Sequence, residues 1–239
     1  MSERFAGSYA PSSPSSSDGW LDVATLNIQF ARKIEQARRL FAREEKLARA
    51  SVVLLQEMDP AGTDALAAAL GMHFVYYPAC VHPTTGRLFG NAVLSRFPIV
   101  RDRKVELPHV SFHNPTRRSA TCATVATPAG ELEVCSVHLA TRFEQLPGAR
   151  RDQMREVVRQ LGGEARVVLG GDCNGYRIGG IAAASGLDWA TRELGGPLRY
   201  VFSIDHLFTR GLRALQVGRI TDTRDATDHP AVWARLAWP

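Results

Sequence analysis

The sequence has few of the features that assign a chain to a class at once. Only four cysteines occur among 239 residues, at positions 80, 122, 135 and 173. They contain no Cys-x-x-Cys zinc spacing, and in a chain of this length they predict no disulfide framework. A reducing, cytoplasmic location is therefore the simplest expectation.

Long apolar runs are also missing. No stretch approaches the ~20 residues that span a bilayer, so no membrane insertion is expected. The amino-terminal segment lacks the apolar centre of a secretory signal. Because residues 1–19 are rich in Ser, Pro and Gly, we predict a flexible tail there, followed by a single domain over residues 20–239.

Neither charge sign dominates the sequence. The formal net charge is +5, a mild basic excess that permits a polyanionic substrate without requiring one. A hydrophobic content of 45% is that of an average globular protein, and it excludes a mostly disordered, collagen-like or rod-shaped chain. The signatures GxGxxG after the first strand, GxxxxGK[ST] and GxSxG are absent, so dinucleotide, P-loop and α/β-hydrolase chemistry lose their main support.

What is present is an alternation of apolar strands and amphipathic helices. Buried strands are predicted at 21–28 and 52–57 with a helix at 31–50 between them, which indicates a parallel strand–helix–strand unit. Further helices are predicted at 60–70 and 145–161, and further strands at 73–79, 91–99, 119–127, 132–139, 166–174, 200–209 and 229–238. Nine or ten strands seldom stay in one sheet, so we expect a mixed α/β protein with two sheets.

Polar side chains repeatedly follow the buried strands. Strand ends converge on one edge in layered α/β folds, and ligands bind there. Carboxylate and amide oxygens suit Mg²⁺ or Mn²⁺, a spare carboxylate can activate a water, and a histidine can stabilise charge on phosphate. The pattern therefore favours phosphoester hydrolysis. The residues concerned are Asn27, Glu57, His138, Asp172, Asn174, Asp205, His206, Asp228 and His229.

Several of these residues, taken one at a time, also have a structural explanation. Asn27 could cap the helix that follows, His138 could be a hydrogen-bonded core histidine, and Asp228 could be a helix cap. The Gly-Gly-Asp-Cys-Asn segment could form an Asx turn. Glu57 is harder to explain in this way, because a carboxylate after a buried apolar run needs a partner. A purely structural role for these residues would require all of these explanations to hold at once.

Seven segments, in this order, resemble the endonuclease/exonuclease/phosphatase superfamily of metal-dependent phosphohydrolases. Its members include pancreatic-type deoxyribonucleases, abasic-site endonucleases, sphingomyelinases and inositol-polyphosphate 5-phosphatases. The segments read LDVATLNI, VVLLQEMD, GNAVLSRFPI, SVHLAT, VVLGGDCN, SIDHLF and TDHPAV, and they extend over almost the whole chain after the tail. The resemblance implies an α/β fold with four layers, an α/β/β/α sandwich of two mixed β-sheets face to face with outer helices.

The resemblance also implies a metal site and a general base. Glu57 would be the main ligand of Mg²⁺ or Mn²⁺, with Asn27 and Asp228 beside it. Asp172 would orient and deprotonate the water that attacks the phosphorus in line with the leaving group.

Five further residues take roles at the phosphate by the same resemblance. Asn174 would hold the scissile phosphate, and Arg118 would face it. His229 would stabilise the transition state, with Asp205 fixing its ring. His138 would contact phosphate or assist the leaving group.

Three positions depart from the family pattern without removing a catalytic group. Leu26 stands where an aromatic residue is usual, Cys173 replaces the usual Phe, and Thr227 replaces Ser. These departures leave the chemistry intact and the subfamily open. Cys80 and His82 lie close together in sequence, but two ligands in a loop make a poor metal site.

Substrate choice in such folds depends on loops around the edge of the site. The candidates are residues 82–90 and 108–118; the second loop offers a phosphate-contacting edge of His109, His113, Arg117 and Arg118, or is an ordinary solvated loop. There is no long basic arm, aromatic–basic interleaving or exposed apolar hairpin along the sequence. We expect a monomeric nuclease acting on DNA or RNA. The alternatives are a phosphodiesterase or phosphatase for a small soluble or lipid-derived phosphoester, and an inactive binding module.

Overall fold

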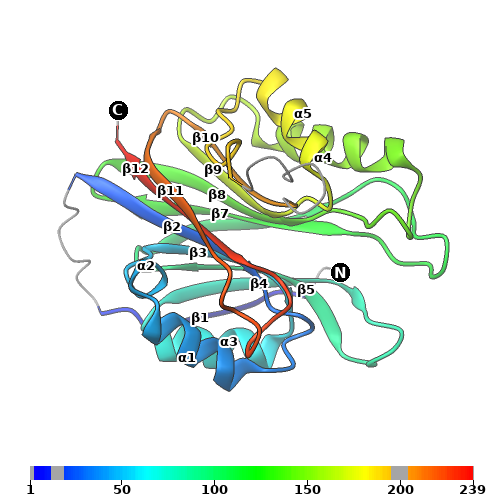
Figure 1. Cartoon of the computed structure of the whole chain (residues 1–239), viewed down its shortest axis with the longest axis horizontal. Helices are drawn as coiled ribbons and strands as arrows, with labels where there is room; N and C mark the ends of the chain where they lie inside the picture. The colour runs from blue at the N-terminus through cyan, green and yellow to red at the C-terminus, as the bar shows by residue number, and fades with distance from the viewer. Residues whose placement is uncertain (1–2, 12–18, 195–203, 239) are drawn as a thin grey trace.

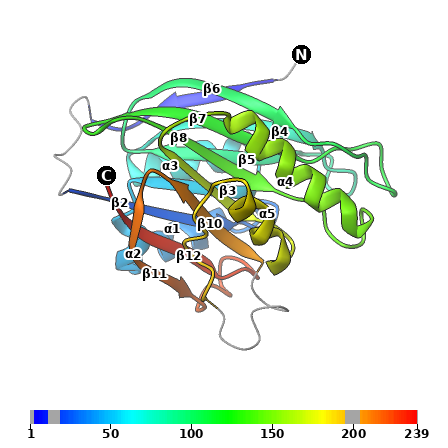
Figure 2. The ribbon, with the colours of Figure 1, turned by 90° about the horizontal axis from the view of Figure 1, so that it is seen from above.

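Two β-sheets stack face to face, and helices cover the outer face of each (Figures 1 and 2). The structure, a computed structural model, describes residues 3–11, 19–194 and 204–238. The expected four-layer α/β/β/α arrangement is confirmed, with two mixed sheets. Within the described part of the chain, no helix is both long and apolar enough to cross a bilayer.

The larger sheet has seven strands and carries the helices of the first third of the chain. Its parallel pair, β2 and β3, is the predicted strand–helix–strand unit, since α1 (Ile34–Arg43) and α2 (Glu45–Ala48) connect the two strands. α3 (Pro60–Leu70) begins at Pro60 after Asp59, whose side chain accepts a hydrogen bond from the Gly62 amide. The strand order is β1 (Phe5–Ser8), β4 (His73–Val81), β5 (Leu88–Ser95), β3 (Val52–Met58), β2 (Trp20–Asn27), β12 (Ala231–Ala237) and β11 (Arg213–Ile220).

The smaller sheet has five strands and a second parallel pair, β8 and β9, connected through α4 (Pro147–Leu161). A short 3₁₀ turn at Tyr176–Ile178 and α5 (Gly179–Ala184) follow β9. The strand order is β10 (Asp205–Arg210), β9 (Val167–Asp172), β8 (Gly130–His138), β7 (Ser119–Thr127) and β6 (Ile99–Glu106).

The hydrophobic core forms three layers, because each sheet is covered on both faces. Alternate residues of β3 show this: Val52 and Leu54 pack between the sheets, whereas Val53 and Leu55 pack under the helices α1–α3. The third layer lies between the smaller sheet and α4, where Met154 is fully buried. Burial on both faces explains the continuous apolar runs in the sequence, and each large buried side chain contributes about 1.5–3 kcal/mol.

The amino-terminal segment differs from the expected tail over residues 1–19. Phe5–Ser8 form β1, which pairs antiparallel with β4. Gly7 permits this, because a Cβ at that position would collide with the ring of Phe74. A short Gly- and Ser-containing strand at a sheet edge carries little apolar signal, so composition alone could not reveal it.

The structure also changes several predicted elements. The single helix expected over 31–50 is divided at Glu44, where the backbone is extended. Besides β1, the strands β6 and β11 went unpredicted, and both lie at the edge of a sheet. Edge strands face solvent and carry charges, such as Arg101, which pairs with Glu131 on the surface, so they lack the apolar alternation of inner strands.

The cysteine prediction is corrected at one pair. Cys122 and Cys135 lie directly opposite each other in the β7–β8 hairpin and form a disulfide in the buried core. The tight turn between the two strands brings together residues that are 13 apart in sequence. Cys80 and Cys173 are free. A disulfide is typical of oxidising compartments, so it does not support the cytoplasmic location, which stays a prediction.

Candidate active site

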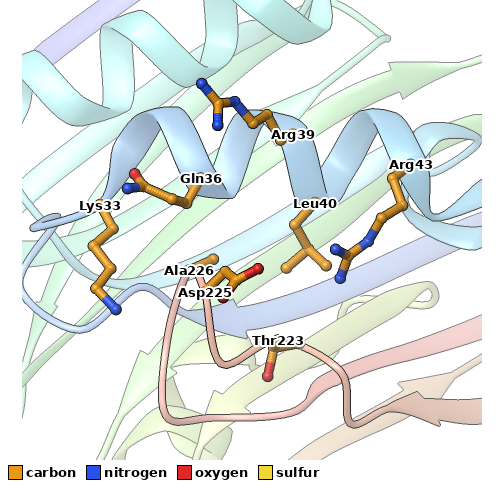
Figure 3. A pocket seen from close by; sticks show the side chains of 8 residues that line it. All are labelled: Lys33, Gln36, Arg39, Leu40, Arg43, Thr223, Asp225 and Ala226. Carbon is orange, nitrogen blue, oxygen red and sulfur yellow. The ribbon is translucent and has the colours of Figure 1, made fainter.

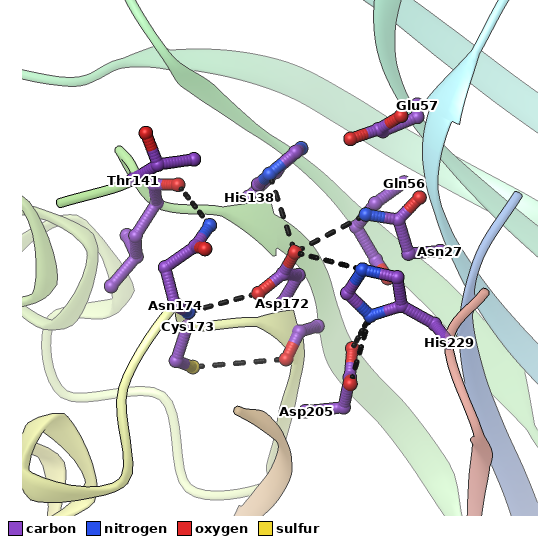
Figure 4. Close-up of polar contacts among 12 residues, drawn as sticks. Asn27, Gln56, Glu57, His138, Thr141, Asp172, Cys173, Asn174, Asp205 and His229 are labelled. Carbon is purple, nitrogen blue, oxygen red and sulfur yellow. Dashed lines mark hydrogen bonds and ion pairs between the residues drawn. The ribbon is translucent and has the colours of Figure 1, made fainter. Parts of the chain in front are cut away.

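The predicted site residues meet where strands of both sheets end (Figure 4). Asn27 and Glu57 come from the ends of β2 and β3 in the larger sheet, and His229 lies just before β12. His138 and Asp172 end the parallel strands β8 and β9 of the smaller sheet. Asp205 begins β10 directly opposite Asp172 in the register. Each sheet therefore supplies part of one cluster.

Asp172 is the centre of this cluster and is almost fully buried, with 2% of its surface exposed. Its Oδ2 atom lies 3.2 Å from Asn27 Nδ2, 3.4 Å from His138 Nε2 and 3.8 Å from His229 Nε2. Its Oδ1 atom accepts a hydrogen bond of 2.9 Å from the backbone amide of Asn174. The carboxylate is thus held in one orientation by groups from both sheets.

The surroundings of Asp172 suit a general base. Burial and the nearby charge of Asp205 together raise the pKa of its carboxyl group to about 7, against the opposing effects of His229, Asn174 and Asn27. A base works best when its pKa is close to the working pH, because it is then both deprotonated and able to take a proton. Asp172 can fill this role near neutrality.

His229 forms a charged pair with Asp205. Its Nδ1 atom lies 3.0 Å from Asp205 Oδ2, while Nε2 points toward Asp172 (Figure 4). Burial disfavours the charged ring, but the hydrogen bond and charge of Asp205, with Asp172 and Asp228, outweigh it and raise the pKa of His229 to about 10. The ring is therefore an imidazolium at neutral pH and can donate a proton or a hydrogen bond from Nε2.

His138 differs from His229 because it is neutral. Burial lowers its pKa well below the ordinary value, and the positive charges of Arg118 and His229 lower it further. Arg118 Nη1 lies 3.0 Å from His138 Nδ1 and 3.2 Å from Nε2, and Nε2 also faces Asp172 at 3.4 Å. Arg118 is itself fixed by Glu144, whose Oε2 atom is 2.7 Å from Nη2. The expected phosphate-facing arginine therefore lies beside the cluster.

Glu57 presents a carboxylate at the edge of the cluster. It has a left-handed backbone (φ 58°) and accepts a hydrogen bond of 3.1 Å from the Phe30 amide. Burial raises its pKa, and a hydrogen bond from Asn27 and the charge of Arg118 oppose this. Asp228, the third predicted ligand, is exposed beside it in the loop before β12. These oxygen atoms suit a hard divalent cation.

A second group of possible ligands lies deeper in the site. Among the described residues, Asp172, Asp205 and His229 offer ligand atoms within 4.8 Å of one another. In this group His229 already pairs with Asp205 through Nδ1, and its Nε2 atom faces Asp172. Glu57 and Asp228 are not part of it. The oxygen donors on the Glu57 side of the cluster are free of such a pairing with any histidine that the structure describes, so the predicted ligand set stays a prediction.

Asn174 lies in the loop after β9, where it was expected to face the phosphate. Its backbone is left-handed (φ 49°), and its side-chain amide donates to the carbonyl of Leu139 at 2.9 Å. Its own carbonyl accepts a hydrogen bond of 2.7 Å from Arg150. The loop that holds Asn174 beside Asp172 is therefore fixed from two directions.

We expect Gly171→Ala to destabilise the folded state severely. Gly171 has φ 144°, and a Cβ there would collide with the Val137 carbonyl of the neighbouring strand and approach Gln56. Because that clash involves backbone, we expect a loss of several kcal/mol of stability, at the severe end for single substitutions. Thermal unfolding followed by circular dichroism measures it. Gly180→Ala is the matched control, since a Cβ there meets open space. An unchanged melting temperature for Gly171→Ala would contradict the prediction.

Three supporting residues were not predicted from the sequence. Gln56 is fully buried and donates to Ser136 Oγ at 2.9 Å, which joins the two sheets behind Asp172. A glutamine inside an apolar run was a usable signal for this role. Glu144 and Arg150, in contrast, occur in a polar, Arg-rich stretch, where no spacing distinguishes them from surface residues.

Two pockets lie on either side of the loop that leads to His229. One, of about 380 Å³, borders Asp205, Asp228 and His229 and also Arg219 and Arg224, so it can receive a group attached to the reacting phosphate. The other, of about 420 Å³, lies between α1 and the loop (Figure 3). None of the predicted catalytic residues lines it. Its lining is Lys33, Gln36, Arg39, Leu40, Arg43, Thr223, Asp225 and Ala226.

Comparison with known proteins gives a consistent result. Residues 24–229 match the family described as Endonuclease/Exonuclease/phosphatase family. No curated protein matches the chain. Among solved structures, an endonuclease/exonuclease/phosphatase from Beutenbergia cavernae has a TM-score of 0.72 at 24% identity, covering 92% of this chain and 72% of that one.

Two other solved structures share the fold at lower identity. D. rerio TDP2 complexed with single strand DNA product has a TM-score of 0.72 at 17% identity, covering 92% of this chain and 99% of that one. The human Nocturnin catalytic domain with bound sulfate anion has a TM-score of 0.72 at 18% identity, covering 99% of this chain and 98% of that one.

Proposed function

The chain belongs to the endonuclease/exonuclease/phosphatase family, whose members are hydrolases acting on phosphoester bonds, and we propose that it hydrolyses phosphodiester bonds of a polynucleotide with a divalent metal ion. The observation that carries this proposal is the cluster around Asp172. A carboxylate with a pKa of about 7 lies beside an imidazolium whose pKa is about 10. Near neutral pH the two groups are a base and a charged donor, as hydrolysis requires.

Asp172 acts on the attacking water in this proposal. It accepts the water proton while the water oxygen forms a bond to phosphorus, in line with the ester oxygen that leaves. The fixed carboxylate holds the water in one position, because Asn27 and the Asn174 amide restrain its two oxygens. Restraint of this kind supplies the proximity and orientation that lower the barrier.

The cationic groups act on the phosphate. The imidazolium of His229 donates from Nε2 to a phosphoryl oxygen that gains charge, and Asp205 holds the ring in that orientation. Arg118 adds a second fixed charge on the His138 side, and Glu144 keeps it in place. The neutral His138 lies between Arg118 and Asp172 and accepts from the Arg118 guanidinium.

A divalent ion fits the oxygen donors at Glu57, Asn27 and Asp228. The partly buried Glu57 carboxylate, whose pKa is raised by burial, gains a counter-charge from such an ion. When bound, Mg²⁺ or Mn²⁺ supplies a Lewis acid that neutralises charge on the phosphate oxygens.

A polynucleotide is the favoured substrate because the chain carries excess positive charge and the edge of the site is rich in arginine. The pocket beside His229 favours a second candidate, a small phosphodiester. A volume of about 380 Å³ is at the lower end of ordinary ligand pockets, large enough for one small substituent of the phosphate.

Hydrolysis assays separate these candidates. Supercoiled plasmid, a single-stranded oligonucleotide and bis-p-nitrophenyl phosphate are each incubated with Mg²⁺, Mn²⁺ or EDTA. Cleavage of a polynucleotide that EDTA abolishes supports the proposal. Cleavage of the small diester alone moves the substrate to a smaller phosphoester, and no metal-dependent cleavage of any of them favours an inactive binding module.

We expect Glu57→Gln to weaken metal activation. The substitution removes one negative charge from the ligand set but keeps its shape, so the half-saturating Mg²⁺ concentration should rise about 10-fold to 100-fold. A Mg²⁺ titration of the hydrolysis rate measures it, and the thermal shift caused by Mg²⁺ should shrink in parallel. Glu35→Gln, on the exposed face of α1, is the control. An unchanged titration would remove Glu57 from the ligand set.

A further inference from the structure

An exposed apolar patch lies on two loops next to the site. We call it the loop patch and define it as Val110, Phe112, Phe143 and Leu146, whose exposed fractions are 40%, 63%, 68% and 67%. Three of its members are more exposed than any other large apolar side chain in the described residues. An exposed apolar cluster of this kind indicates a binding surface.

The two loops form one surface because hydrogen bonds join them. The Phe112 amide donates to the Glu144 carbonyl at 3.0 Å, and His113 Nε2 lies 3.0 Å from the Phe143 carbonyl. The Gln145 side chain also donates to the Val110 carbonyl. One loop leads into β7 and the other follows β8, so both lie at the end of the smaller sheet where His138 is found (Figures 1 and 2).

The two segments that form this surface carry most of the chain's net positive charge. Residues 108–118 and 141–151 contain five arginines and one carboxylate, a formal charge of +4 where the whole chain carries +5. The guanidinium of Arg142 lies over the ring of Phe143, 4.8 Å from its centroid. Aromatic rings with arginines around them combine π-faces with anion-binding groups, although no such interleaving exists along any one segment of the sequence.

The loop patch is connected to the reacting centre through two side chains. Glu144, the residue after Phe143, accepts the hydrogen bond from Arg118, which in turn contacts His138. Arg150, in the same arginine-rich segment, donates to the Asn174 carbonyl. A ligand that lies on the patch can therefore continue directly to a phosphate beside Asn174 and Asp172.

We propose that the loop patch binds the nucleotides next to the scissile phosphate of a single-stranded polynucleotide. Unpaired bases stack on Phe112 and Phe143, and Arg117, Arg142 and Arg151 pair with the neighbouring backbone phosphates. Single strands fit better than duplexes, because only unpaired bases offer a free π-face to an aromatic side chain. This inference rests on the proposed phosphodiester hydrolysis and names the form of the substrate.

Binding measurements in EDTA test the patch separately from catalysis. The probe is a fluorescein-labelled oligothymidine of about ten nucleotides, a length in the range of single-strand sites, and its anisotropy is titrated with the full chain. We expect Phe112→Ala and Phe143→Ala each to weaken binding by about 5-fold to 100-fold. Leu215→Ala and Val100→Ala remove apolar side chains that are also exposed, on β11 and β6, and should leave binding unchanged.

The arginines give a second, independent measurement. We expect Arg142→Gln and Arg151→Gln each to reduce the slope of log affinity against log salt by about 0.7, the value for one lost phosphate contact on a single strand. A duplex of the same sequence should bind more weakly to the wild type and should respond less to the phenylalanine variants. Each variant replaces an exposed side chain, so each should fold. Its melting temperature is measured as the check.

Three results would overturn the inference. The first is oligothymidine binding by both phenylalanine variants as tight as that of the wild type. The second is duplex binding that the phenylalanine substitutions weaken as much as single-strand binding. The third is binding to vesicles of phosphatidylglycerol that depends on Phe112 and Phe143 while oligothymidine binding does not, which would assign the patch to a lipid surface. A wild type that binds oligothymidine through the patch but hydrolyses no phosphodiester would contradict the proposed function alone.

Discussion

Asp172→Asn is expected to lower the hydrolysis rate by about 10²-fold to 10⁴-fold, the usual contribution of a general base. The amide has nearly the same shape as the carboxylate and can still accept from the Asn174 amide, but it cannot take a proton from water. The decrease should therefore appear in kcat, with little change in KM. Steady-state kinetics on a phosphodiester at saturating Mg²⁺ measure it.

Asp64→Asn is the control for this prediction, because Asp64 is an exposed carboxylate on α3 that accepts a hydrogen bond from the Tyr9 hydroxyl, on the outer face of the larger sheet. It should retain the wild-type rate. Asp172→Asn should still show a Mg²⁺-dependent thermal shift, since the proposed ligands are intact. If the variant keeps most of its rate, another group is the base and the assignment is wrong.

Asp205→Asn is expected to move both sides of the pH profile to lower pH. In the wild type, activity should rise as Asp172 loses its proton near pH 7 and fall as His229 loses its proton near pH 10. The charge of Asp205 is one of the causes that raise each of these pKa values. Its removal therefore lowers both. Above the new pKa of His229 the phosphate loses a charged donor, which costs about 10²-fold in rate.

The pH dependence distinguishes this role from a merely structural one. A variant that is only less stable would lose activity at every pH by a similar factor, whereas Asp205→Asn should retain most of its rate on the acidic side. His229→Ala should lose the alkaline side of the profile altogether, because no ring remains to titrate. An Asp205→Asn profile with unmoved limbs would show that Asp205 does not set the charge of His229.

The fold could be predicted well where both faces of a strand are buried. β2, β3 and β9 were found because their apolar runs are continuous, and α3 because Pro60 and Gly71 delimit it. The edge strands β1, β6 and β11 were missed because one edge meets solvent and their composition is that of a loop, whereas the edge strand β10 is buried and was predicted. The disulfide was not predicted, because it depends on the register in which β7 and β8 pair. That register places Cys122 opposite Cys135, whereas the sequence shows only how many residues separate the two cysteines.

The same distinction holds for the site. Residues at strand ends, such as Glu57 and Asp172, are conspicuous because a charge follows a buried run. Glu144 and Arg150 act by fixing other side chains, and they lie among many surface charges, so nothing in the sequence distinguishes them. The loop patch was also hidden, because Phe112 and Phe143 are 31 positions apart and meet only through loop pairing.

The division of the site between the two sheets has a consequence for how activity arises during folding. The base belongs to one sheet, while His229 and the proposed metal ligands come from the other, and Gln56 joins the sheets by its hydrogen bond to Ser136. Neither sheet alone therefore contains both the base and the proposed metal ligands. The first turnover of a refolding chain therefore marks the moment when the two layers dock, and an intermediate with only one sheet formed is catalytically silent.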